Sequence, residues 1–516
     1  MSDKIVNFQQ RRQLEQAFAA LAQSGSEAEV LSVARKLVND FPAAAIIPLL
    51  VKNLDTVNSQ LRGGLHRLAA LLPQEEMTTT LSAVVADQQR SPQARMTALS
   101  IAEQALGLEL PTALISDLGD SDNAAMESLR EAVAAGKQNR HIFLEYVLQM
   151  QQHDEEIAFL VLDALHRLPA EDRVELLRLI AQDARPTVAG AALIHLERLI
   201  RSDASPATVA ATLRALHILQ FALTGTLRQQ AERALRKLRM AGKRYDPPAT
   251  EGWRALLSPA EINGSQSLWL IRRPAGELLD GSLLGFVLNL NAGVLRVFAS
   301  ENLARDLLPD AHPLGTLVNV NTDEGGSMTL LEVPFAYGQW LAQQALALHQ
   351  TGKVTLPLSS EFTLYNDLFW QFAPPEVDEE IKQLLQRPTT EPGVTSPTTE
   401  QLAAYTQAFF AHPAQEGWAA QGRALMQMIR KPLQIPRELP VTEVVQLLLR
   451  ELTKWPEQAT LQAALAAGLR TQAGWLHYAG SPALAQQAHL LATYTQHAPL
   501  DQNPVLIHLL VISLGQ

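Results

Sequence analysis

The chain has 516 residues, of which 47% are hydrophobic and 18% charged, so it can form several domains with ordinary apolar cores. It contains no cysteine, which excludes disulfides, thiol nucleophiles and cysteine-ligated metal sites. The formal net charge of −11 argues against general affinity for nucleic acid or anionic membranes. No stretch reaches the ~20 apolar residues of a membrane span, and the first residues lack the apolar core of a secretory signal. We therefore expect a cytoplasmic protein without a membrane anchor.

The first part of the chain, residues 1–245, repeats a helical pattern. Leucines stand at i, i+4, i+7 and i+11 in one stretch, which is the spacing of a single helix face: Leu61, Leu65, Leu68 and Leu72. Similar helices recur, and each follows another amphipathic one. Their anchor leucines are 34, 30, 33 and 31 residues apart: Leu65, Leu99, Leu129, Leu162 and Leu193. A pair of helices repeated every 30 to 34 residues predicts an α-solenoid.

Short segments in this region resemble the start of the second helix of a HEAT repeat. The segment 91–99 (SPQARMTAL) shows the pattern, and 61–65 (LRGGL) and 227–231 (LRQQA) share its spacing. The segment 184–193 also matches, although Ala189 stands where the family usually has a basic residue. The resemblance to HEAT/armadillo-type repeat proteins covers roughly residues 25–240. It implies a solenoid that acts as a scaffold or adaptor, and it carries no catalytic residues onto this chain.

A basic cluster closes the helical array. Its members lie within 17 residues: Arg228, Arg233, Arg236, Lys237, Arg239, Lys243 and Arg244. Cations near a helix C-terminus complement the helix dipole, and the last repeat of an array needs a solvated outer face. These effects favour a capping role. The alternative is a binding surface, and its candidate residues are Arg233, Arg236, Lys237 and Arg239.

Residues 251–373 change character and hold 12 of the 28 aromatic residues. The hydrophobic period shifts toward two, which predicts strands at 267–272, 283–289, 294–299, 316–321 and 328–333, with hairpins joining the middle pair and the last pair. Helices are expected at 301–308 and 337–349. The pattern predicts a small α+β domain with an antiparallel sheet.

An aromatic stripe follows in the same region. Phe362, Tyr365 and Phe369 fall on one face of a predicted helix, and Trp370 lies beside them. A stripe of this kind is usually core. It could instead anchor a protein partner, because buried aromatic residues dominate many interfaces. Alanine at these positions would separate the two interpretations, since loss of core residues unfolds the domain.

The last part of the chain is helical again. Residues 387–400 (RPTTEPGVTSPTTE) have no apolar periodicity and are predicted to be a flexible linker. Beyond it, residues 401–516 are predicted to form a helical domain, with helices at 401–411, 418–429, 441–452, 459–479, 482–497 and 505–514.

No sequence motif indicates catalysis. Nucleotide-binding glycine loops, the HExxH zinc motif and the GxSxG elbow are missing. The segment 319–325 (NVNTDEG) is nearest to a calcium loop, but a hairpin turn explains it better. We therefore predict no catalytic residue, cofactor or metal site. The first hypothesis is a non-catalytic scaffold with a protein partner. An enzyme with its site in 251–373, or in a cleft with the solenoid, is the alternative. A nucleic-acid-binding solenoid is the third, and the 27 basic and 29 acidic residues of 1–250 disfavour it.

Overall fold

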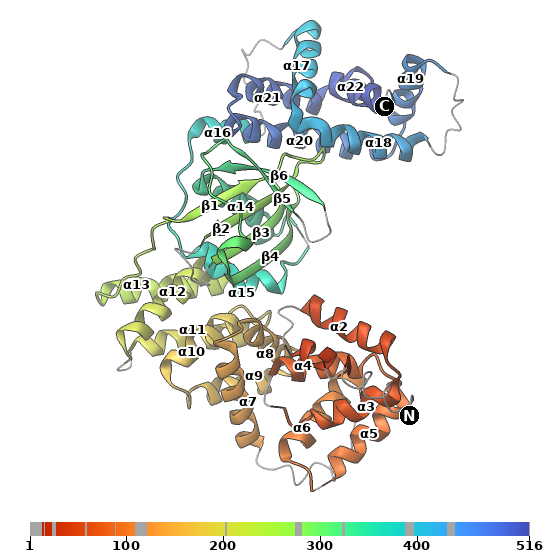
Figure 1. Ribbon diagram of the computed structural model, residues 1–516. Helices are drawn as coiled ribbons and strands as arrows, with labels where there is room; N and C mark the ends of the chain where they lie inside the picture. Colours follow the sequence, from red (N-terminus) through yellow and green to blue (C-terminus); the bar gives the residue numbers. More distant parts are fainter. Residues whose placement is uncertain are drawn as a thin grey trace. The chain divides into compact units, whose positions relative to one another are not determined.

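In the computed structural model the chain divides into two units, residues 1–245 and residues 246–516 (Figure 1). The structure describes residues 13–14, 16–22, 27–56, 59–87, 89–108, 121–201, 204–273, 281–321, 326–354, 356–386, 397–430 and 439–514. In these ranges the first unit is helical, and the second combines helices with an antiparallel sheet. The mainly α class with a small α+β region is confirmed. None of the described helices is both long and apolar enough to cross a bilayer.

The first unit is a succession of helices joined by short connections. Two of the helices begin with a proline after a serine, and the hydroxyls of Ser91 and Ser205 accept hydrogen bonds from the backbone N–H of Ala94 and Thr208. The helices are α2 (Glu27–Asp40), α3 (Ala43–Lys52), α4 (Ser59–Ala69), α5 (Gln74–Ala86), α6 (Pro92–Ser100), α7 (Ser121–Gly136), α8 (His141–Gln151), α9 (Glu155–Leu165), α10 (Ala170–Ile180), α11 (Pro186–Arg201), α12 (Pro206–Ala222) and α13 (Gly225–Met240).

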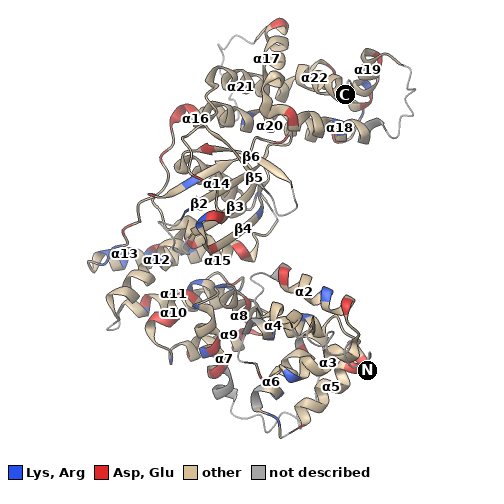
Figure 2. Ribbon diagram, viewed as in Figure 1, with Lys and Arg blue, Asp and Glu red and all other residues tan. Residues whose placement is uncertain are grey.

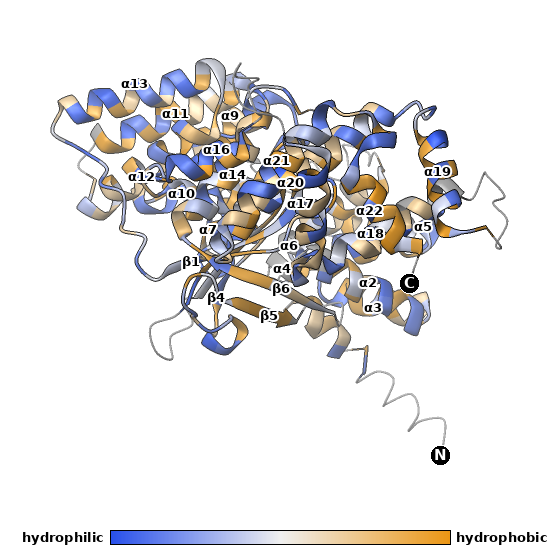
Figure 3. Ribbon diagram, turned by 90° about the horizontal axis from the view of Figure 1, so that it is seen from above, coloured by the Kyte–Doolittle hydropathy of each residue, from blue (hydrophilic) through white to orange (hydrophobic). Residues whose placement is uncertain are grey.

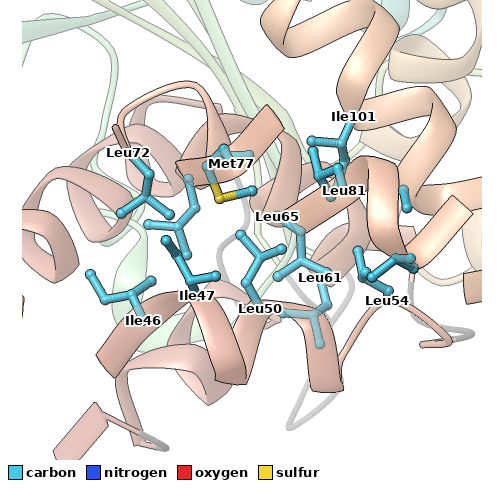
Figure 4. Close-up of a cluster of buried hydrophobic side chains, with 14 of the residues drawn as sticks. Ile46, Ile47, Leu50, Leu54, Leu61, Leu65, Leu72, Met77, Leu81 and Ile101 are labelled. Atoms are coloured by element: carbon cyan, nitrogen blue, oxygen red, sulfur yellow. The ribbon is translucent and has the colours of Figure 1, made fainter. Parts of the chain in front are cut away.

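The N-terminal part of this unit has a continuous apolar core. Leu61 and Leu65, from the helix face that the leucine spacing predicts, meet side chains of α3 and α5 (Figure 4). Leu50, Leu65 and Leu81 are completely buried. Burying a leucine completely stabilises the fold by about 1.5–3 kcal/mol, so the periodic leucines account for much of this packing.

From α7 onward the helices lie in two layers. Helices α8, α10 and α12 contact one another in one layer, and α7, α9, α11 and α13 do so in the other. Gln230 Nε2 donates to the carbonyl O of Gly190, and Lys237 Nζ donates to Glu197 Oε1, each across 40 residues of chain. Because both contacts join residues that are 40 apart in the sequence, α11 and α13 run parallel and in register. Membership of the HEAT/armadillo-type family stays a prediction.

A partly buried ion cluster around Arg178 joins α8 to α10. Arg178 is 1% exposed, and its Nη2 lies 2.8 Å from Glu175 Oε1. Arg140 Nη2 lies 2.7 Å from the same oxygen. Burial alone would raise the pKa of Glu175, but the two guanidinium charges outweigh it and hold that pKa well below its usual range. The carboxylate therefore stays ionised and keeps Arg178 paired.

The second unit contains a six-stranded sheet whose neighbouring strands are all antiparallel, in the order β4-β3-β2-β1-β6-β5. The registers Asn289↔Gly293 and Asn321↔Ser327 confirm the two predicted hairpins. One strand, β1, was not predicted, because its sequence (WRALL) shows no clear alternation of apolar and polar residues. The strands are β1 (Trp253–Leu257), β2 (Ser265–Arg272), β3 (Gly281–Asn289), β4 (Gly293–Leu303), β5 (Leu317–Asn321) and β6 (Ser327–Val333).

The helix predicted at 301–308 is wrong. β4 continues through this region as far as Leu303, which pairs with Gly281 of β3, and a single 3-10 turn, Arg305–Leu307, follows. Asn302 has a φ of +58°, and the register shifts beside it, so the strand bends here without becoming a helix. Leu303 and Leu307, four residues apart, fit one helical face in the sequence. In the structure Leu303 packs against the sheet, while Leu307 is 68% exposed.

Two helices cover one face of the sheet. They are α14 (Phe335–Gln350), which matches the helix predicted at 337–349, and α15 (Ser360–Trp370). A side chain at Gly338 would place its Cβ 2.7 Å from Ala255 Cβ, so the absence of a side chain lets α14 approach β1. His349 Nε2 accepts a 2.8 Å hydrogen bond from Val294 N, which ties the end of α14 to the β3–β4 hairpin.

The C-terminal helices complete the second unit. Residues 387–396 of the predicted linker lie outside the described residues, and its last two residues belong to the first helix after it. Figure 3 shows α22 as hydrophobic along most of its length, and α22 packs against α17, α18 and α19. The helices are α16 (Glu379–Leu385), α17 (Thr399–Ala411), α18 (Glu416–Arg430), α19 (Val441–Leu452), α20 (Gln458–Tyr478), α21 (Pro482–His497) and α22 (Pro504–Leu514).

The loop between β1 and β2, residues 258–264, joins the sheet to these helices. Trp418 Nε1 donates to the carbonyl O of Ala260, and Gln472 Oε1 accepts from Ala260 N, both at 2.6 Å. Trp475 Nε1 donates to Leu257 O at 3.0 Å. A Cβ on Gly468 would overlap the carbonyl O of Ile262. The regions 251–373 and 401–516, predicted as separate domains, therefore lie together in one unit.

Candidate protein-interaction surface

The aromatic stripe predicted as a partner site is buried. Phe362 is 4% exposed, Tyr365 4%, Phe369 0% and Trp370 7%. The rings of Phe362 and Phe369 lie 6.0 and 5.6 Å from the ring of Phe286 on β3. The stripe is the face with which α15 packs on the sheet, because large apolar rings gain most by leaving water there. Its interpretation as a partner-binding surface is therefore corrected to the core interpretation.

Most of the basic cluster lies on α13, whose ribbon carries blue positions in Figure 2, and Lys243 and Arg244 follow the end of the helix. Arg233, Arg236, Lys237 and Arg239 are all exposed. Lys237 lies 3.4 Å from Glu197 on α11, and Arg228 lies 2.9 Å from Glu232 one turn along α13. Within the described part of the chain, Arg233, Arg236 and Arg239 have no carboxylate partner. The cluster therefore leaves three cations available to a ligand.

Exposed apolar side chains gather on the neighbouring helices α9 and α11. Leu160 is 56% exposed and Phe159 41% on α9, and Ile194 is 44% exposed on α11. Single exposed apolar residues are common on protein surfaces, but several on adjacent helices form a patch that water disfavours. The leucine spacing predicts the buried side of these helices and gives no sign of this exposed side.

Helix geometry places these residues on one face. On α9, Ala158, Leu162 and Leu165 are buried, so Leu160, nearly half a turn away, points outward. On α11, Leu193 and Leu196 are buried and Ile194 points outward in the same way. On α13 the buried residues are Ala231, Ala234 and Leu238, which turns Arg236 outward. The three helices neighbour one another in a single layer, so their outer sides form one continuous surface.

We call this the α9–α13 surface, defined by Leu160, Ile194, Arg198, Arg233, Arg236 and Lys237. Contacts between the helices fix its register. The rings of His166 and His195 lie 4.4 Å apart and join α9 to α11, while Gln230 and Lys237 join α13 to α11. Ile194 and Arg233 therefore lie at similar heights along their helices. The surface presents Leu160 and the exposed Asp163 on α9, Ile194 and Arg198 on α11, and cations on α13.

The histidine pair lies at the inner edge of this surface. Burial, together with the neighbouring charges of His166 and Arg198, lowers the pKa of His195 to about 4, and Asp163 opposes this change. His195 is thus neutral near pH 7 and adds no positive charge to the surface.

Among the described residues of the α+β part, the most buried carboxylate is that of Glu332 on β6. Burial raises the pKa of Glu332, and the guanidinium of Arg254 opposes the change. Arg254 Nη1 lies 2.9 Å from Glu332 Oε2, and Arg254 Nη2 donates to Pro309 O at 2.7 Å. The pair holds the segment after the 3-10 turn against the sheet, which is a structural role.

The other potential sites among the described residues do not bring together side chains that could carry out a reaction. Among the described residues, no group of three or more histidine, aspartate or glutamate side chains is placed to hold a metal ion. A shallow hollow beside α2 is lined by one helix alone, by Leu31, Arg35, Lys36 and Asp40 among others. Residues of a single helix face cannot surround a substrate as opposing elements do. No arrangement of the described residues therefore supports the enzyme alternative.

Comparison with known proteins gives no assignment. The chain matches no protein-family model, and neither the curated proteins nor the solved structures contain a match to it.

Proposed function

We propose that this chain is a non-catalytic scaffold or adaptor that binds a partner protein through the α9–α13 surface. The observation that carries the proposal is the pair of outward apolar side chains, Leu160 on α9 and Ile194 on α11, in the same layer as α13, whose exposed Arg233 and Arg236 have no carboxylate partner among the described residues. Apolar side chains at the centre of a polar surface are typical of protein interfaces, where they leave water on binding. The HEAT-type resemblance supports the same role, since such arrays bind other proteins along stacked helices.

The experiment compares the full-length protein with two single variants. Leu160→Glu places a charge in the centre of the surface. Leu307→Glu is the matched control, because Leu307 is a leucine 68% exposed in the second unit. Tagged proteins are used to isolate partners from native lysate, with crosslinking to locate the contact.

The proposal is supported by a partner that crosslinks to α9, α11 or α13. This partner should still bind the Leu307→Glu variant and should no longer bind the Leu160→Glu variant. A partner that both variants retain, or a crosslink confined to the second unit, places binding elsewhere and overturns the assignment of this surface. The proposal includes the cytoplasmic location that the sequence predicts, and fractionation of cells would test it.

A nucleic-acid-binding solenoid receives no separate support. Asp154, Glu155 and Glu156 stand at the start of α9, where they would repel phosphates from that end of the surface.

A further inference from the structure

The charges of the α9–α13 surface are unevenly distributed. On α13, Arg233 and Arg236 are three residues apart, and Arg236 and Arg239 are again three apart, so these side chains are neighbours on the helix. Like charges at this spacing repel one another. The helix dipole at the C-terminus offsets part of this repulsion. The remaining positive potential faces solvent beside the exposed side chains of Ile194 and Leu160.

Such a surface selects its ligand by two properties at once. An apolar stripe covers Leu160 and Ile194 and gains from leaving water. Carboxylates on one flank of that stripe would pair with Arg233 and Arg236 of α13. The opposite flank meets the carboxylates at the start of α9, so acidic groups are disfavoured there. Attraction on one side and repulsion on the other give the ligand an orientation.

We propose that the α9–α13 surface binds an acidic amphipathic helix of a partner protein, with its apolar stripe over α9 and α11 and its carboxylates toward α13. This inference rests on the proposed function and names the chemistry of the partner. With one flank toward α9 and the other toward α13, such a helix lies along α11, whose 16 residues span about 24 Å.

A protein helix fits better than a nucleic acid for a physical reason. Phosphates would pair with the arginines of α13 but would leave Leu160 and Ile194 in contact with water. The acidic start of α9 would repel a phosphate backbone that crossed the whole surface. Only a ligand with apolar and acidic sides matches both parts of the surface.

The test uses the full-length protein and four fluorescent probes, measured by anisotropy. The first is a helical peptide with a leucine stripe and glutamates on one flank. The second carries lysines in place of the glutamates, the third replaces the leucines by serine, and the fourth is a single-stranded oligonucleotide of equal charge. The protein variants are Leu160→Glu, the double variant Arg233→Glu/Arg236→Glu, and Leu307→Glu as control. Circular dichroism confirms that each variant is folded.

We expect the leucine–glutamate peptide to bind best, and the double variant to weaken it at least about tenfold while gaining affinity for the lysine peptide. A merely structural role of the arginines would not produce this exchange of preference. Leu160→Glu should weaken the same peptide, and Leu307→Glu should not. Binding should also fall with rising salt.

Three results overturn the inference. The lysine peptide could bind the unaltered protein equally well, the oligonucleotide could bind best and be lost with the same variants, or none of the peptides could bind. In each case the capture experiment with Leu160→Glu still decides whether the surface binds a protein at all. The capture experiment therefore separates two failures: a wrong inference about the acidic amphipathic helix, and a wrong assignment of protein binding to this surface.

Discussion

The two units of the chain are held together over different lengths of sequence. In the first unit, side chains that join neighbouring helices span 35 residues from Arg140 to Glu175 and 40 from Lys237 to Glu197. In the second unit, Trp418 reaches Ala260 across 158 residues, and Trp475 reaches Leu257 across 218. A helical array built from near neighbours can lose order locally, whereas a unit built on distant contacts is expected to unfold as a whole.

The largest expected effect tests the long-range contact. Gly468→Val forces a side chain into the carbonyl groups of Ile262 and Glu261, which are backbone atoms and cannot move aside alone. We expect the second unit to lose about 3 kcal/mol or more of unfolding free energy. All seven tryptophans lie in that unit, so the tryptophan fluorescence of a urea titration reports it directly.

The matched control for that experiment is Gly417→Ala. Gly417 is also a glycine of a C-terminal helix, but a Cβ there meets nothing within 4 Å. Alanine should be neutral or slightly stabilising at this position. If Gly468→Val unfolds at the same urea concentration as the unaltered protein, the loop is not a structural connection of the unit.

A somewhat smaller effect is expected for the ion cluster of the first unit. Glu175→Gln removes the negative charge between Arg140 and Arg178, and Arg178 is almost completely buried. Leaving a buried cation without its counter-ion should cost about 3 kcal/mol. Far-UV circular dichroism should show an earlier transition while the tryptophan transition stays in place. The exposed Glu171 of the same helix provides the control Glu171→Gln, and an equal loss in both variants would contradict the role of burial.

The histidine pair predicts a pH effect confined to the first unit. The folded pKa of His195, about 4, lies below the ordinary 6.5, so the unfolded chain takes up the proton first as the pH falls. Stability should therefore decrease between pH 6.5 and pH 4, by about 1 kcal/mol because water screens the half-exposed ring. Urea titrations at pH 7 and pH 5 measure the difference. His195→Gln should show a smaller decrease, and an unchanged one would assign the effect to other groups.

The smallest effect is expected at the α9–α13 surface. Leu160 and Arg236 make no buried contact that their loss would expose, so Leu160→Ser and Arg236→Ala should change the unfolding free energy by no more than about 0.5 kcal/mol. Thermal unfolding followed by circular dichroism checks this. A loss of several degrees in the midpoint would mean that these residues support the fold and are unsuitable as binding probes.

Periodicity predicts the helices better than the sheet. The leucine spacing locates the helices of the first unit because one side of each is buried at every turn. The same signal is misleading at Leu303 and Leu307, which are four residues apart although β4 ends at Leu303 and only a 3-10 turn follows. The sequence pattern also separates 251–373 from 401–516, because a domain boundary is judged from local composition. Local composition gives no sign of the hydrogen bonds that Trp418 and Trp475 make to residues far away in the sequence.

The candidate surface could be predicted only in part. Arg233, Arg236, Lys237 and Arg239 stand out as a run of charges in the sequence, and the structure places them on an exposed helix face. Leu160 and Ile194 could not be recognised, because an outward leucine in a leucine-rich helix looks like another core residue. Phe362 and Phe369 were recognised as a stripe, yet only the contact with Phe286 shows that they pack against the chain's own sheet.

The insertion of the 258–264 loop between α18 and α20 gives the second unit connections that do not run along the backbone. The segments before Gln386 and after Pro397 are joined by side-chain hydrogen bonds and by close packing at Gly468 and Gly264. A chain cut between Gln386 and Pro397 should stay associated as a non-covalent pair of fragments. The unit could accordingly be produced as two complementary polypeptides, in the way that split reporter proteins are reconstituted from their halves.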